Sequence, residues 1–203
     1  AGLQAVRDAR YPDYSIIQLT DGNAPPFFID GQIDGGASLM AINEEKLRVI
    51  AAIQPQKILM TWMAYGKNST NDLQKELAVL HDSIARLRAV SPNSEIIVVG
   101  QFPHWSVSLA KNLMDYLAQN NHFPRHMRQG LDARYQQWDE YFRSHLDQPH
   151  TRYLSAQQVL CEPSGCLTSV DGSVAGLTAV DWGHLTKAGS IYLAEQLAPR
   201  IFE

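Results

Sequence analysis

Short apolar segments alternate with long amphipathic ones along this chain of 203 residues, and that alternation constrains the fold most. Residues 57–62 and 95–101 are almost continuous apolar runs, as expected of strands that are covered on both faces of a parallel sheet. Residues 14–20 and 151–155 are predicted to be two further strands. Because helices separate the strands, the order predicts an α/β fold with helices on both faces of a parallel sheet.

The intervening segments have helical signatures. Leucine and isoleucine recur at steps of three and four between residues 73 and 87, which is the spacing of one helix face. Ser38 is placed to cap the helix that follows it. The predicted helices cover residues 1–10, 38–53, 69–90, 106–119, 131–146 and the segment after His184. The pattern starts on a helix, whereas the first helix of an α/β sheet normally follows a strand.

Composition indicates a folded domain without a strongly charged partner. Hydrophobic residues make up 45% of the chain and charged residues 19%, with a formal net charge of -4. This balance predicts a packed core and not disorder. The absence of a Lys/Arg cluster argues against nucleic acid as a partner, and no apolar run is long enough for a membrane span. Since the chain begins with Ala1 and not Met, we expect a processed product or a piece of a longer protein.

The chain has two cysteines, Cys161 and Cys166, in the segment CEPSGC. Proline and glycine between them allow a sharp turn, so a short-loop disulfide is one interpretation, and it indicates an oxidising compartment. The other interpretation is a pair of reduced thiols in a cytosolic protein. A zinc site is not predicted, because the spacing differs from Cys-x-x-Cys and no second pair exists.

Asp181 and His184 lie three residues apart in the segment AVDWGHLTKAG, just before the last helix. At this spacing the carboxylate can accept a hydrogen bond from the imidazole Nδ1–H, which fixes the tautomer and orientation that a general base requires. Asp-x-x-His also occurs by chance, and Asp181 is equally suited to cap a helix. The spacing makes Asp181 and His184 candidates for two members of a catalytic triad. The surrounding residues are needed to choose between this role, a chance pattern and a helix cap.

Those surrounding residues resemble the C-terminal part of the SGNH (GDSL-type) esterase domains. Among these domains, they most resemble the SGNH domains that follow the membrane acyltransferase domain in bacterial surface-polysaccharide O-acetyltransferases. The shared features are Cys161, Cys166, the Asp-Gly step at 171–172, Asp181, His184, Leu185, Thr186 and Gly189. Upstream, the segments PQKILMTWMAY, IIVVGQFPHW and LTDGNAPPFF are similar to strands and loops of the same family, although Ala24 stands where the family has cysteine. The resemblance covers nearly the whole chain.

The resemblance implies a three-layer α/β/α sandwich of the SGNH type and acyl transfer through a Ser-His-Asp acyl-enzyme. In that mechanism His184 takes the proton of the serine and Asp181 orients His184. The family's serine lies in a Gly-Asp-Ser motif between the first strand and the first helix, but no Gly-Asp-Ser occurs in these 203 residues. We therefore expect the nucleophile just upstream of Ala1, and residues 1–203 to form one SGNH-like domain without its first strand.

The resemblance also implies the partners and the location of the domain. The acceptor is expected to be a surface carbohydrate, and the acyl group is expected to come from a membrane acyltransferase domain of the same parent chain. No metal or organic cofactor is implied. The domain is expected outside the cytoplasm, in the periplasm or cell envelope. Without its serine, this chain alone is expected to be inactive.

Four further residues are candidates for substrate or oxyanion contacts. Gly22 and Asn23 follow the predicted strand at 14–20, where related folds place an oxyanion donor. Trp62 and Tyr65 lie at the end of the next predicted strand. Aromatic faces suit an acyl or sugar pocket there, although core packing explains them as well.

Three serines inside the chain are alternatives for the nucleophile. Ser38 follows a polar, glycine-rich loop and is interpreted as a helix cap. Ser106 follows a predicted strand and lies near His104, but not at the position of the family's nucleophile. Ser190 stands where the family has alanine and is interpreted as a packing residue.

Two other functions fit the same residues. The first is a non-catalytic carbohydrate-binding domain that keeps the SGNH fold without a nucleophile, in which Asp181 and His184 are structural partners. The second is a stand-alone secreted carbohydrate esterase, which would have a signal peptide upstream where the acyltransferase has a membrane domain.

Overall fold

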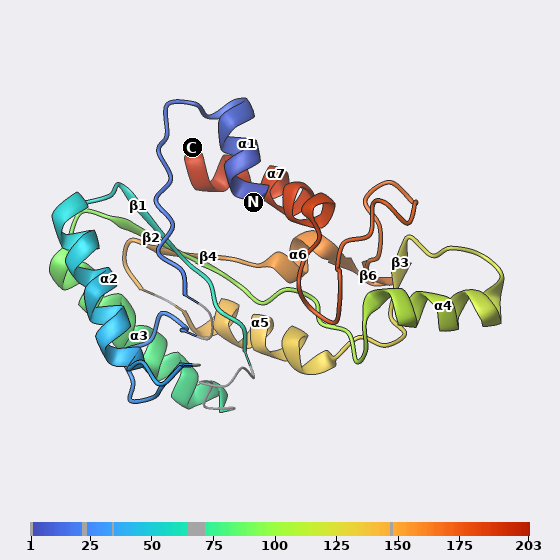
Figure 1. The fold of residues 1–203 in the computed structure, drawn as a ribbon, viewed down its shortest axis with the longest axis horizontal. Coiled ribbons are helices and arrows are strands. Elements are labelled where there is room, and N and C mark those ends of the chain that lie inside the picture. The colour runs from blue at the N-terminus through green and yellow to red at the C-terminus, as the bar shows by residue number, and fades with distance from the viewer. Residues whose placement is uncertain (1, 22–23, 34, 65–71, 147) are drawn as a thin grey trace. The chain divides into compact units, whose positions relative to one another are not determined.

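The computed structural model of the chain describes residues 2–21, 24–33, 35–64, 72–146 and 148–203 (Figure 1). Contacts divide the chain into two compact units. The first unit combines Ala1–Ile16, Phe102–Gln137 and Ser155–Glu203, and the second combines Ile17–Gln101 and Trp138–Leu154. The expectation that residues 1–203 form a single domain stays a prediction.

A parallel three-stranded sheet lies at the centre of the second unit. Its strands are β1 (Lys57–Met60), β2 (Glu95–Val99) and β4 (Thr151–Leu154), in the order β1-β2-β4. Ile96, Ile97 and Val98 are all fully buried. Because neighbouring residues of a strand point to opposite faces, the middle strand is covered on both sides. The predicted α/β class with a parallel sheet is confirmed.

Two helices of the second unit follow the sequence signals closely. Helices α2 (Leu39–Ile53) and α3 (Leu73–Val90) pack against each other. Ser38 caps α2, because its side chain accepts a hydrogen bond from the N–H of Ala41. Asp72 caps α3 in the same way. Helix α3 therefore begins after Asp72, whereas the predicted helix began at residue 69.

The predicted strand at residues 14–20 is wrong. None of these residues pairs with a described strand, and the Ile17 side chain is largely exposed. Tyr14 instead lays its ring against Phe202 and donates its hydroxyl to the Phe202 carbonyl. An alternating apolar pattern forms a strand only where a neighbouring strand supplies hydrogen-bond partners, and the described residues supply none here.

The first unit is built mainly from helices. Its first and last helices, α1 and α7, pack side by side. A buried apolar cluster lies between α4 and a small sheet, with Trp105, Leu109, Leu113, Met127, Cys166 and Ala179 at its centre. The helices are α1 (Gly2–Arg10), α4 (Leu109–Asn120), α6 (Ala156–Leu160) and α7 (Lys187–Phe202), while α5 (Ala133–His145) begins in this unit and ends in the second.

The small antiparallel sheet of this unit carries the disulfide. Its strands are β3 (His126–Met127), β5 (Cys161–Glu162) and β6 (Gly165–Leu167), in the order β3-β6-β5. Cys161 and Cys166 face each other across the β5–β6 hairpin and are joined by a disulfide. The disulfide interpretation is therefore confirmed. The sheet itself was not predicted, because strands of two or three residues leave no periodic pattern in the sequence.

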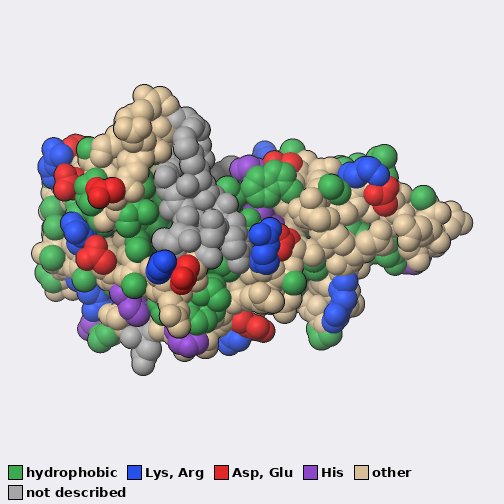
Figure 2. All heavy atoms as spheres, turned by 90° about the horizontal axis from the view of Figure 1, so that it is seen from below, with side chains coloured by type: hydrophobic (Ala, Val, Ile, Leu, Met, Phe, Trp, Pro, Cys, Tyr) green, Lys and Arg blue, Asp and Glu red, His purple; other side chains and the backbone are tan. Residues whose placement is uncertain are grey.

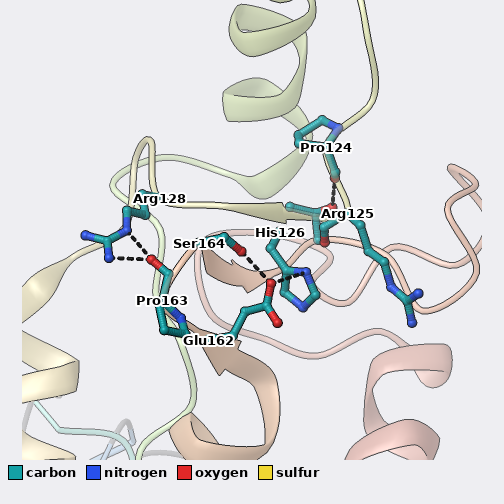
Figure 3. A network of polar contacts seen from close by, with 8 residues as sticks. Pro124, Arg125, His126, Arg128, Glu162, Pro163 and Ser164 are labelled. Carbon is teal, nitrogen blue, oxygen red and sulfur yellow. Dashed lines mark hydrogen bonds and ion pairs between the residues drawn. The ribbon is translucent and has the colours of Figure 1, made fainter.

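Polar contacts hold the tip of this hairpin on both sides (Figure 3). The Glu162 carboxylate accepts a hydrogen bond of 2.5 Å from the Ser164 hydroxyl and lies 3.2 Å from Nδ1 of His126. On the other side, the Arg128 guanidinium donates to the carbonyl of Pro163. Gly165 has a φ of 133°, and a Cβ there would lie 2.2 Å from the Met127 backbone. The hairpin thus has little freedom even apart from its disulfide.

Charged side chains of both signs are interspersed over the face drawn in Figure 2, and no large basic patch is visible among the described residues there. This distribution agrees with the small net charge of the chain. Of the helices in the described ranges, none is both long enough and apolar enough to cross a membrane.

Candidate active site

Asp181 and His184 meet on a tight turn in the first unit, which is called the 181–184 turn below. Oδ2 of Asp181 lies 2.8 Å from Nδ1 of His184. Oδ1 of the same carboxylate accepts the backbone N–H groups of Gly183 at 2.9 Å and of His184 at 2.8 Å. One carboxylate therefore closes the turn and orients the imidazole. Asp181 is not the cap of the last helix, because Thr186 holds that position.

These hydrogen bonds set the charge of Asp181 and the tautomer of His184. Desolvation raises the pKa of the Asp181 carboxyl. The N–H groups of Gly183 and His184 and the imidazole outweigh it and lower that pKa to about 2. Asp181 is thus ionised at neutral pH, and Nδ1 of His184 carries the proton that it accepts. Nε2 of His184 has no hydrogen-bond partner among the described residues, and the side chain is exposed.

The backbone of the 181–184 turn is anchored to the segment that leads into α4. The carbonyl of Trp182 accepts the N–H of Trp105 at 2.6 Å, and the carbonyl of Asp181 accepts the N–H of Leu109, the first residue of α4, at 3.0 Å. The two ends of the turn also meet, since the N–H of Val180 donates to the His184 carbonyl at 2.8 Å. The pair is therefore fixed by backbone contacts as well as by its own hydrogen bond.

Helix α7 starts directly after the turn. Thr186 is its N-cap: the side chain accepts the N–H of Gly189 at 3.0 Å, and the backbone N–H of Thr186 donates to the Thr178 carbonyl at 3.0 Å. A Cβ on Gly189 would lie 2.3 Å from that carbonyl oxygen. The glycine of the motif thus lets the first turn of α7 sit close behind His184.

A buried histidine, His104, lies directly against the 181–184 turn. Its ring stacks on Tyr135 at 3.5 Å, and its Nδ1 lies 2.9 Å from the Phe102 carbonyl. Because a carbonyl only accepts, Nδ1 carries the hydrogen, and Nε2 is a buried acceptor that finds no hydrogen-bond partner among the described residues. A Cβ on Gly183 would lie 2.4 Å from that Nε2. The turn fits over the imidazole only because residue 183 is glycine.

The start of α1 lies against α7, a few residues after His184. The backbone N–H of Gly2 donates to the Ser190 hydroxyl at 2.8 Å, and a Cβ on Gly2 would lie 2.1 Å from the Ser190 carbonyl oxygen. Ser190 therefore does more than fill space in place of alanine, because its hydroxyl ties the first helix to the helix that follows His184.

The comparisons with known proteins decide the family. The profile of the SGNH domain that is fused to AT3 domains matches residues 1–199. The chain belongs to this SGNH family. A solved structure, the periplasmic domain of a Salmonella ser. Paratyphi A lipopolysaccharide acetyltransferase, is 37% identical with a TM-score of 0.95. That match covers 100% of this chain and 78% of the Salmonella chain.

Two other comparisons add little to the family assignment. A peptidoglycan O-acetylesterase is 16% identical with a TM-score of 0.49 over 77% of this chain and 39% of that chain, which is too distant to bear on this SGNH domain. A search of curated proteins gives no match.

Four further residues of the SGNH domain were predicted as site residues. Gly22, Asn23 and Tyr65 fall outside the described residues. Trp62 is buried in an aromatic cluster, with its ring 5.0 Å from Phe27, and it donates its indole N–H to Glu76 at 3.1 Å. In this structure Trp62 therefore packs in the core. The roles of these four residues in substrate or oxyanion binding stay predictions.

The three candidate serines have other roles among the described contacts. Ser38 is the cap of α2, and Ser190 is the acceptor for Gly2. Ser106 uses its backbone N–H to bind the Gly130 carbonyl, and no described hydrogen bond joins it to His184. The described residues also contain no group of three His, Cys, Asp or Glu side chains that could hold a metal ion.

One aromatic residue beside the site escaped the sequence analysis. Trp182 lies between Asp181 and His184, with its ring 5.6 Å from the His184 ring and 5.2 Å from the buried His104 ring. The sequence signal that could have identified Trp182 was its position inside the Asp-x-x-His motif, two residues before His184.

Proposed function

We propose that Asp181 and His184 are two members of a Ser-His-Asp triad, and that the parent protein transfers an acetyl group to a hydroxyl of a surface polysaccharide. The observation that carries this proposal is the 2.8 Å contact from Asp181 Oδ2 to Nδ1 of His184, with Nε2 left available. A general base needs this tautomer and this free nitrogen. Membership of the SGNH family that is fused to AT3 domains supports the same chemistry.

The reaction proceeds in two balanced steps. The serine oxygen attacks the acyl carbonyl while Nε2 of His184 takes the serine proton, and the imidazolium then gives that proton to the departing group. In the second step Nε2 takes the proton of the acceptor hydroxyl, whose oxygen attacks the acyl-serine, and the proton returns to the serine. Asp181 stays ionised and stabilises the imidazolium each time.

The nucleophile is proposed to be a serine that precedes Ala1 in the parent protein. The sequence contains no Gly-Asp-Ser motif, and in this family that motif opens the first helix. The contact of Gly2 with Ser190 supports this position, since it brings the start of α1 to the beginning of α7, close in sequence to His184. On this proposal the 203 residues alone lack the covalent route.

The relatives support a proposal for the donor, the acceptor and the location. Because the family is defined by fusion to AT3 domains, we propose that the acyl group arrives from a membrane domain of the same parent chain. The Salmonella relative is the periplasmic domain of a lipopolysaccharide acetyltransferase, which supports a carbohydrate acceptor and a periplasmic location for this domain. Cys161 and Cys166 are bonded, which suits an oxidising compartment.

The test is acetyl-enzyme formation from p-nitrophenyl acetate in a chain extended upstream of Ala1. We expect a burst of nitrophenol and a mass increase of one acetyl group on one serine. Asp181→Asn should slow the burst by about 10³- to 10⁴-fold, because the imidazole loses the partner that fixes its tautomer. The matched control is Asp171→Asn, at the other Asp of the family pattern. An extended chain with no burst would favour the carbohydrate-binding alternative.

A further inference from the structure

We propose that Trp182 is the stacking surface for the acceptor sugar, which holds the acceptor hydroxyl at Nε2 of His184. The inference rests on the proposed function, because it takes His184 as the base. The chain has four tryptophans. Trp62, Trp105 and Trp138 are 9%, 4% and 1% exposed, whereas Trp182 is 38% exposed. Trp182 is therefore the most exposed of the four rings, and it lies beside the imidazole that the proposed function uses as the base.

The distances place Trp182 within reach of the acceptor. A hydroxyl that gives its proton to Nε2 has to approach within about 3 Å of that atom. The ring that carries the hydroxyl then lies next to the imidazole, whose centre is 5.6 Å from the indole. The Trp182 ring contacts the rings of both His184 and His104, and of these two imidazoles His104 is buried whereas His184 is exposed.

The chemistry of the indole favours a sugar ring. An aromatic face is electron-rich, so it attracts the weakly positive C–H groups that line one face of a pyranose. The acetyl group itself has a single methyl group and offers little area to an indole. A saccharide brings a rigid apolar face together with the hydroxyl that is acetylated, so one ring satisfies both Trp182 and His184.

The support beneath Trp182 keeps its ring in place before the sugar arrives. The Trp182 carbonyl is bound by the N–H of Trp105, and the ring lies against His104, which is itself stacked on Tyr135. Gly183 lets this layer approach closely, since any Cβ would meet the imidazole of His104. A preorganised side chain loses little conformational entropy when a ligand stacks on it.

The test uses the intrinsic fluorescence of the chain, because Trp182 is the tryptophan that solvent reaches most. Methyl glycosides of glucose, galactose, mannose and rhamnose are titrated to about 100 mM, well above the 1 mM range of weak complexes. We expect at least one glycoside to change the emission saturably and to protect it from iodide quenching. Sorbitol, which has the hydroxyls but no rigid ring face, should have no such effect.

Two variants and one control make the assignment specific. Binding measured by calorimetry should weaken about three- to tenfold in Trp182→Ala, the value of one aromatic contact, and should be partly restored in Trp182→Phe. Val180 is exposed and directly precedes the 181–184 turn, so Val180→Ala should bind the glycoside as the unchanged chain does. Circular dichroism and melting curves check that each variant is folded.

The outcomes separate this inference from the proposed function. Saturable binding that depends on Trp182 supports the inference, even if no serine of the extended chain is acylated, which would overturn the proposed function alone. Acylation of the extended chain with no glycoside effect at any concentration overturns the inference alone. A saturable change with S-ethyl thioacetate and none with glycosides would assign Trp182 to the acyl donor and overturn the inference as well.

Discussion

At the scale of single residues, His104 is a buried titratable group that lies directly against the candidate site. Burial lowers the pKa of its imidazole. The Phe102 carbonyl and the carboxylates of Asp132 and Asp181 oppose that shift, and the neighbouring His184 adds to it, so that the net pKa is below the ordinary value. The folded protein therefore keeps His104 neutral at a pH where an unfolded chain protonates it.

This difference predicts an acid-sensitive stability. Below about pH 6.5, the ordinary value for histidine, the unfolded chain binds a proton at residue 104 that the folded chain does not bind. The free energy of unfolding should therefore fall as the pH drops from 7 to 5. In His104→Phe this contribution is absent, so urea denaturation should show a flatter pH dependence. Equal slopes for the two proteins would contradict the buried, neutral state of His104.

The contact between Gly183 and His104 gives a second prediction at this scale. In Gly183→Ala the new methyl group meets the imidazole at 2.4 Å, and the ring cannot retreat because Tyr135 stacks on it. Such overpacking costs about 1–3 kcal/mol of unfolding free energy. In a His104→Ala background the same change should cost much less. A cost that is the same in both backgrounds would contradict this account, because it would show that the cost does not arise from the contact with His104.

The residues of the site were predictable to the extent that their contacts are local. Asp181 and His184 are three positions apart, so the spacing alone indicated that they meet. His104 lies some eighty positions before Gly183, and no periodicity links the two. Its role became visible only once Gly183 was seen to have no room for a Cβ.

At the scale of elements, the correct predictions were again those that depend on local sequence, and the incorrect ones depend on contacts with distant residues. The cap at Ser38 and the buried strand at β2 depend on a few neighbouring residues or on an uninterrupted apolar run, and both were predicted. The strand expected at residues 14–20 needed a partner strand, and the sequence of one strand does not say whether a partner is present. The hairpin of β5 and β6 depends on pairing over two or three residues and was missed.

The disulfide of that hairpin is predicted to contribute modestly to stability. Cys161 and Cys166 are separated by only five positions, and closing so short a loop restricts the unfolded chain by about 2 kcal/mol. The double variant Cys161→Ala/Cys166→Ala should lose about that much in urea denaturation. The contacts of Glu162 and Arg128 should still hold the hairpin, so proteolysis at residues 161–166 should not increase strongly. Loss of folding in the double variant would contradict the modest contribution that we assign to the disulfide.

At the scale of the whole molecule, the edge of the parallel sheet is the feature with the widest consequences. β1 has a strand on one side only among the described elements, and parallel sheets are normally covered at their edges and faces. We expect a strand upstream of Ala1 to complete the sheet. A chain extended upstream should then unfold at higher urea and remain monomeric where the 203-residue chain self-associates. A monodisperse, equally stable 203-residue chain would count against the missing strand.

The central claim is that the 181–184 turn serves a serine that lies before Ala1. Intact-mass analysis after treatment with a fluorophosphonate tests it most directly, on the 203-residue chain and on the extended chain, each with its His184→Ala variant. We predict no adduct on the 203-residue chain, and on the extended chain a single adduct that disappears in the variant. A His184-dependent adduct on the 203-residue chain would contradict it, because an activated serine would then lie within these residues.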